Sequence, residues 1–84
     1  MLTDSQIQEI IDNAHEEAVV WDGFDQALIG TDIGGRLVYS IERMEKVLMD
    51  RDGMTKEDAK EFLDFNTFGT NAGDFTPLHV YLYI

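Results

Sequence analysis

The N-terminal segment of the chain has a clear pattern of apolar and polar positions. Apolar side chains return every three or four residues, at Ile7, Ile10, Ile11, Ala14 and Ala18. This spacing places them on one face of a helix, with polar residues opposite. Thr3, followed by Gln6, is the sequence signature of a capping box. The pattern therefore predicts a helix over residues 4–18.

Two short apolar runs follow, separated by a glycine-rich connection. Residues 27–29 and 36–39 are mostly apolar or aromatic, and the glycines between them tolerate turn conformations. This arrangement predicts a β-hairpin. Residues 78–84 then alternate with period two, which predicts a third strand. The core-facing residues of that strand would be Leu78, Val80, Leu82 and Ile84, and the outward residues His79, Tyr81 and Tyr83.

Two further helical patterns lie between the hairpin and the last strand. Ser40 precedes a helix that Gly53 ends, and Thr55 precedes a helix that Gly69 ends. The chain of 84 residues is expected to form one domain, residues 1–84, with the order α-β-β-α-α-β. The simplest fold for this order is α+β, with a small antiparallel three-stranded sheet and helices packed on one face.

The charges are distributed unevenly along the chain. All six Lys and Arg residues fall between positions 36 and 60, whereas the first 35 residues contain eight Asp or Glu and no basic residue. Most of the net charge of −11 therefore comes from one end of the sequence. A field of this sign repels nucleic acid and attracts basic protein surfaces. The charge pattern predicts a protein partner with a basic surface and no direct binding of nucleic acid.

The acidic residues of the first predicted helix are the leading candidates for partner binding. Glu9, Asp12 and Glu16 recur on the polar face and would form a ridge of carboxylates. The alternative is that this face is only a solvated surface that keeps the protein soluble. The full candidate set adds three neighbouring acids and comprises Glu9, Asp12, Glu16, Glu17, Asp22 and Asp25.

No pattern in the sequence indicates catalysis, a metal or a cofactor. The absence of cysteine excludes disulfides and thiolate metal sites. Residues 30–35 lack the lysine of a phosphate loop, and an EF-hand register centred on Gly53 would place Leu48 and Ala59 at ligand positions. No apolar run approaches the roughly 20 residues that a membrane helix needs. We expect a protein that is not an enzyme, has no metal or cofactor, and does not enter a membrane.

Two other groups of residues provide alternative sites. Asn66 falls among apolar residues on the predicted inner side of the third helix, and a buried amide needs a hydrogen-bond partner. It would bond either the end of its own helix or the acidic loop, forming a polar site with Asp22 and Asp25. The outward face of the last strand, with His79, Tyr81 and Tyr83, is an alternative interface that would serve a homodimer.

Several short motifs resemble those of a small family of tailed-bacteriophage proteins. They are DGFDQALIG at 22–30, RDGMTKEDA at 51–59, FNTFG at 65–69 and the closing Thr76-Pro77. The resemblance implies a phage origin, and thus the cytoplasm of a bacterial host, but carries over no catalytic residue.

The leading hypothesis is a small acidic phage protein that binds another protein. Inhibition of a host nucleic-acid-binding defence or transcription enzyme, of anti-CRISPR or anti-restriction type, is one form of this hypothesis. The alternative is a self-associating structural or accessory module.

Overall fold

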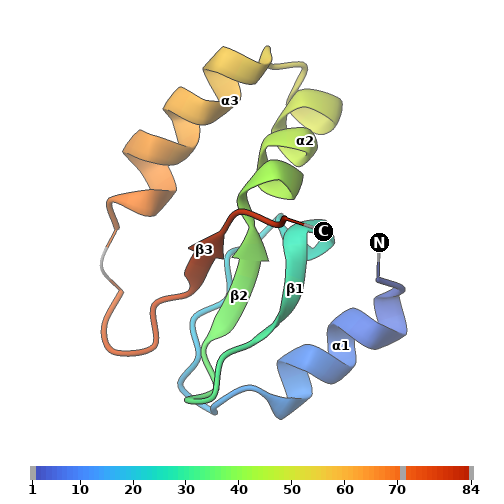
Figure 1. Ribbon diagram of the computed structural model, residues 1–84, viewed down its shortest axis with the longest axis vertical. Helices are drawn as coiled ribbons and strands as arrows, with labels where there is room; N and C mark the ends of the chain where they lie inside the picture. The colour runs from blue at the N-terminus through green and yellow to red at the C-terminus, as the bar shows by residue number, and fades with distance from the viewer. Residues whose placement is uncertain (1, 71, 84) are drawn as a thin grey trace.

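The computed structural model describes residues 2–70 and 72–83 and has the predicted order of elements (Figure 1). The α+β fold class is confirmed. The elements are α1 (Asp4–Asn13), a short 3₁₀ helix η1 (Asp25–Ala27), β1 (Leu28–Thr31), β2 (Leu37–Ser40), α2 (Ile41–Asp52), α3 (Lys56–Leu63), a π-helical turn η2 (Asp64–Phe68) and β3 (Leu78–Val80).

Each helix begins where a capping residue was predicted. The Thr3 hydroxyl accepts a hydrogen bond from the Gln6 amide, and the Gln6 side chain accepts one from the Thr3 amide, which completes the capping box. At the start of α2 and α3, the Ser40 and Thr55 hydroxyls accept from the Arg43 and Asp58 amides, without the reciprocal bond of a capping box. Gly53 ends α2 with a positive φ of 70°, a conformation that favours glycine.

The sheet is mixed, so the prediction of a purely antiparallel sheet was wrong. β1 pairs antiparallel with β2 across the hairpin, but β2 pairs parallel with β3. The reason is the helical connection: after β2 the chain passes through α2 and α3, and it returns to the end of the sheet at which β2 begins. A strand that follows such a crossover runs parallel to the strand before it.

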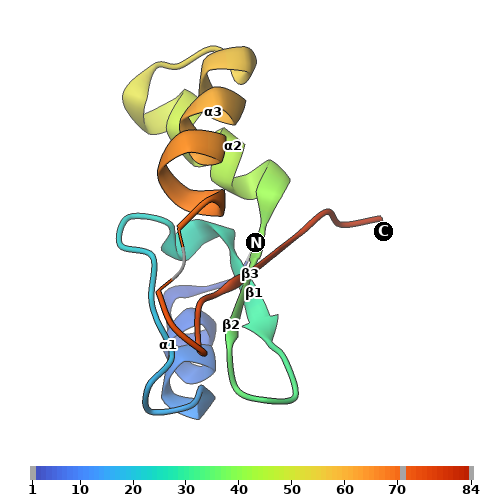
Figure 2. The same ribbon diagram turned by 90° about the vertical axis from the view of Figure 1, so that its left-hand side faces the viewer.

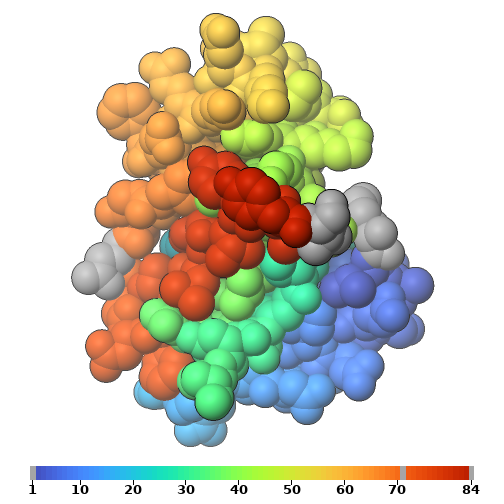
Figure 3. Space-filling model, in the orientation of Figure 1, coloured from blue at the N-terminus to red at the C-terminus, as the bar shows by residue number. Residues whose placement is uncertain are grey.

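The helices lie in two places relative to the sheet (Figure 2). α1 and the connecting segment 14–24 lie on one face of the sheet, while α2 and α3 form an antiparallel pair beyond one end of it. None of the described helices lies on the opposite face, which is at the front of the space-filling view (Figure 3). Of the three α-helices described, only α1 therefore covers a face of the sheet, whereas α2 and α3 pack at its end, which differs from the prediction of helices on one face.

The core lies where the covered face of the sheet meets the helices. Every element except η2 and β3 contributes at least one buried apolar residue to it. Leu28, Leu37 and Tyr39 come from the strands, Met44 and Leu48 from α2, and Ala59 and Leu63 from α3. Burial of such side chains is the main source of stability in a chain of this size.

The two faces of the last strand are the reverse of the prediction, which placed Leu78 and Val80 toward the core and His79 outward. His79 lies opposite Tyr39, whose ring is fully buried, so His79 points toward the covered face. Leu78 and Val80 alternate with it, lie toward the open face and are only half-buried. The strand ends at Val80; of the other residues predicted to face the core, Leu82 follows the strand and Ile84 lies outside the described residues.

Candidate functional site

The acidic N-terminal part of the chain remains largely uncompensated in the folded protein. Seven of its eight carboxylates are exposed and form no ion pair with any described residue. The exception is Asp32, which binds Arg36 at 2.8 Å across the hairpin turn. The Arg36 backbone amide also donates to this carboxylate and holds the pKa of Asp32 below its usual value.

Glu9 and Asp12 project from α1, but Glu16 does not, because the helix ends earlier than predicted. α1 stops at Asn13 and Ala14 is already extended, with φ −71° and ψ 163°. The predicted helical ridge is therefore shorter, and Glu16 lies in the turn that follows. Asp12 and Glu16 nevertheless remain neighbours, since both line one surface pocket of about 370 Å³.

The turn that carries Glu16 and Glu17 is fixed by the hairpin and by the loop before β3. The His15 amide donates to the Gly35 carbonyl at 2.9 Å, and the His15 ring stacks on Phe75 with centroids 3.9 Å apart. The Glu17 amide donates in turn to His15 Nδ1 at 3.0 Å. These contacts fix the backbone of the turn, so the two exposed glutamates project from a defined place on the surface, and less backbone entropy would be lost on binding.

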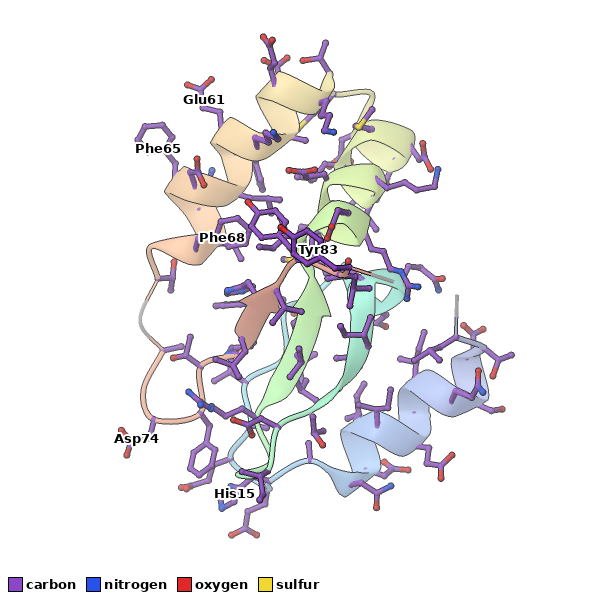
Figure 4. All side chains as sticks on the ribbon, in the orientation of Figure 1. His15, Glu61, Phe65, Phe68, Asp74 and Tyr83 are labelled. Carbon is purple, nitrogen blue, oxygen red and sulfur yellow. The ribbon has the colours of Figure 1, made fainter. Side chains whose placement is uncertain are left out.

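The structure adds one acid that the sequence did not place in this group. Asp74 lines the same small surface pocket as Glu17, and Figure 4 shows Asp74 and His15 at the same end of the molecule. These two acids are 57 positions apart in sequence, and no local pattern relates them. The tertiary contact between His15 and Phe75 brings their segments together.

Asp22 and Asp25 lie at the other end of the connecting segment. Figure 2 shows this segment rising from the end of α1 to η1, so that these two acids are separated along it from Glu16 and Glu17. They lie near the Tyr39 hydroxyl. Burial raises the pKa of Tyr39, and the charges of Asp25 and Asp22 act in the same direction. The candidate set therefore occupies two regions of the surface.

The predicted polar site of Asn66 with Asp22 and Asp25 is not formed among the described residues. Asn66 is exposed, and its amide donates to the Phe62 carbonyl one turn earlier at 3.0 Å. The cause is the π-helical turn η2, whose wider turn rotates Thr67 rather than Asn66 toward the interior. Of the two bonding partners considered for Asn66, the end of its own helix is the one it uses.

The predicted alternative interface is divided by the structure. Tyr81 is 59 % exposed and Tyr83 is 92 % exposed, but His79 is directed to the covered side of the sheet. Trp21 Nε1 donates to His79 Nε2 at 2.8 Å, and the ring of Phe68 lies 4.7 Å from the imidazole. His79 therefore helps to hold β3 in the sheet and is not on the face with the two tyrosines.

His79 makes the free energy of unfolding decrease as the pH falls. Burial lowers the pKa of His79 below its ordinary value of 6.5, so the unfolded chain takes up a proton where the folded chain does not. This contribution is complete above pH 6.5 and decreases as the pH falls toward the lowered pKa. Urea unfolding between about pH 7 and pH 5 should show the loss, whereas His79→Gln should remove that part of the slope. An identical slope in both proteins would contradict this assignment.

Three of the six basic residues, Arg36, Lys46 and Arg51, form an ion pair with a carboxylate among the described residues. Lys46 pairs with Asp50 at 2.9 Å, and Arg51 pairs with Asp52 through two hydrogen bonds of 3.0 Å. Arg51 also donates to the Gly23 carbonyl. Arg43, Lys46 and Arg51 line one pocket of about 360 Å³, but two of these three cations already have a carboxylate partner. This surface is a weak attractor for phosphate.

Comparisons with protein-family models, curated proteins and solved structures found no match to this chain. The bacteriophage resemblance therefore remains a prediction.

None of the helices in residues 2–70 and 72–83 has the length and apolar character to cross a membrane. Within the same residues, no group of three or more His, Cys, Asp or Glu side chains could hold a metal ion.

Proposed function

We propose that this chain is a small non-enzymatic protein that acts by binding a basic surface of another protein. The observation that carries the proposal is the exposed and unpaired state of seven carboxylates in the first 35 residues. Unpaired surface charges of one sign produce a field that guides an oppositely charged partner during encounter. The residues proposed to make contact are Glu9, Asp12, Glu16 and Glu17, with Asp22 and Asp25 as a second group.

The arrangement of the first group supports binding and not only solubility. Asp12 and Glu16 line a common pocket, and the turn with Glu16 and Glu17 is held by contacts to Gly35 and Phe75. A surface needed only for solubility would not require a turn held in one position, whereas specific recognition gains from such a turn. Asp74 extends the same acidic surface.

The type of partner follows from the charge and from the sequence resemblance. A basic protein groove that normally holds nucleic acid would attract this acidic surface, which would then compete with the nucleic acid. The resemblance to tailed-bacteriophage proteins supports a target in the cytoplasm of a bacterial host. A defence or transcription enzyme of the host, inhibited in the manner of an anti-CRISPR or anti-restriction protein, fits both features.

Affinity purification from an extract of the bacterial host tests the proposal. The baits are the natural protein, the variant Glu9→Lys/Asp12→Lys, and the control Glu57→Lys/Asp64→Lys, which changes the net charge equally on the helix pair. We expect the natural protein and the control to retain a basic protein that the first variant loses. Recovery of the same proteins on all three baits would contradict the role of the α1 carboxylates.

Self-association is the second candidate function, and one observation favours it. Tyr81 and Tyr83 are exposed on the C-terminal segment, which lies across the front of the molecule (Figure 3), and Tyr81 lines a surface pocket with residues of α2, α3 and η2. Exposed aromatic residues are common at interfaces between proteins. Sedimentation over a range of concentrations distinguishes self-association from binding of a basic partner. Self-association predicts a dimer of the natural protein and a monomer of the Tyr81→Ser/Tyr83→Ser variant.

A further inference from the structure

The outer side of α3 and η2 exposes a large aromatic residue that the core does not use. Phe65 is 79 % exposed, whereas Phe68, in the same π-helical turn, packs against the core cluster. Figure 4 shows Phe65 and Glu61 pointing away from the body of the molecule. A phenyl ring left in water forgoes the stabilisation that its burial would provide.

Phe65 belongs to a continuous stripe along the helix. Asp58, Glu61, Phe62 and Phe65 follow one another at spacings of three, one and three residues, which places them on one helical face. Phe62 is 36 % exposed. Together with Met54 and Asn66 these residues line a shallow surface pocket of about 400 Å³, and we call this surface the α3 stripe.

The rim of the α3 stripe is acidic and unneutralised. Asp58 and Glu61 are exposed and form no ion pair with any residue in the described part of the chain. No basic residue lines the pocket, although Lys56 and Lys60 lie on the same helix. The Asn66 amide is occupied by the Phe62 carbonyl. The stripe thus offers two aromatic rings next to two carboxylates.

We propose that the α3 stripe docks an amphipathic, basic helical segment of a partner protein. An apolar side chain of that segment would pack against Phe62 and Phe65, while its Lys or Arg residues would meet Asp58 and Glu61. Helical segments are recognised in this way through apolar anchors, with flanking charges selecting the partner. The charge of the rim selects this occupant over an acidic or neutral one. The proposal does not depend on the acidic surface near α1.

An NMR titration of the ¹⁵N-labelled protein with two synthetic peptides tests the proposal. One peptide is an amphipathic helix of leucine and lysine, and the other has the same length and charge with serine in place of leucine. We expect the leucine–lysine peptide to shift the amide signals of residues 54–66. The serine–lysine peptide should leave these signals unchanged, because charge alone does not fill the space beside the two rings. Leucine–lysine shifts confined to other parts of the protein would overturn the proposal.

Two variants make the test specific. Phe65→Ala should weaken binding of the leucine–lysine peptide about ten-fold, as expected for removal of an aromatic anchor. Ile33→Ala, which removes a fully exposed apolar side chain at the hairpin turn, should change the affinity less than about two-fold. Glu9→Lys/Asp12→Lys changes the acidic surface near α1 and not the α3 stripe, so the peptide should still shift the signals of residues 54–66. The peptide result is therefore independent of whether the proposed function is correct.

Two outcomes would contradict the assignment of the occupant. Equal affinity of the natural protein and Phe65→Ala for the leucine–lysine peptide would show that the rings do not contribute. A dimer in sedimentation that disappears in Phe65→Ala would assign the α3 stripe to a second copy of this chain. Either result would overturn the proposal of a basic helical partner.

Discussion

Replacing Gly35 with alanine is expected to lower the free energy of unfolding by about 2–5 kcal/mol, combining backbone strain with overpacking. Gly35 has a positive φ of 90°, which L-residues adopt only at a cost. A Cβ at this position would also lie 2.8 Å from the backbone nitrogen of His15. Backbone atoms cannot rotate away as a flexible side chain can. The turn that carries Glu16 and Glu17 would therefore have to move.

Gly53→Ala is the matched control for this prediction. Gly53 also has a positive φ, of 70°, but an added Cβ would have no neighbour within 4 Å. The Gly53→Ala variant should therefore lose about 1–2 kcal/mol of unfolding free energy, which is the cost of the positive φ alone. Urea denaturation of both variants measures the difference. Equal losses would show that the close approach of Gly35 to His15 does not constrain the turn.

Replacing Trp21 with alanine is expected to cost about 3 kcal/mol, the lower end for loss of a large aromatic residue because Trp21 is only half-buried. Its indole ring stacks on His79 with centroids 6.1 Å apart and donates a hydrogen bond to His79 Nε2. Its side chain thereby joins the connecting segment to β3, which has only three residues. Without the indole, β3 should separate from the sheet more readily than the other strands.

Trp21→Phe separates packing from hydrogen bonding in this contact. The phenyl ring retains most of the stacking surface but lacks the N–H donor, so the expected loss is about 1 kcal/mol. Unfolding measurements give the total loss, and amide hydrogen exchange of residues 78–80 reports the local opening of β3. If Trp21→Ala left exchange at β3 unchanged, the indole would not be what holds this strand.

The features predicted from sequence are those determined by neighbouring residues. Thr3 with Gln6, Ser40 and Thr55 begin helices because their hydroxyls accept bonds from amides three residues later. Gly53 ends α2 because its conformation excludes most other residues. The hairpin follows from two apolar runs and the glycines between them. These interactions act over a few positions, so the order α-β-β-α-α-β could be predicted.

The features that the sequence did not predict depend on contacts between distant segments. α1 ends at Asn13 because the His15 amide bonds the Gly35 carbonyl, although the apolar pattern continues to Ala18. His79 faces the covered side because Trp21, 58 positions away, supplies its hydrogen bond. Alternation along a strand gives two faces but does not say which one is covered. The parallel pairing of β3 likewise follows from the path of the helices.

The candidate site was predictable in charge but not in shape. The excess of acidic residues before position 36 is visible in the sequence, and the exposure of seven of them agrees with it. Their division into two regions could not be predicted, because it depends on where α1 ends and how segment 14–24 runs. Asp74 joins Glu17 only through the stacking of His15 on Phe75. Asn66 was misplaced because one π-helical turn changed the helical register.

The most direct test of the account is the rate at which this protein associates with the partner identified by affinity purification. Association should slow markedly as salt is raised, because exposed charges are screened beyond about 8–10 Å at physiological ionic strength. At low salt, Glu9→Lys/Asp12→Lys should associate about ten-fold more slowly or worse, while Glu57→Lys/Asp64→Lys should change the rate less than about three-fold. Equal association rates for all three proteins at low and high salt would contradict the proposal that the acidic surface binds the partner.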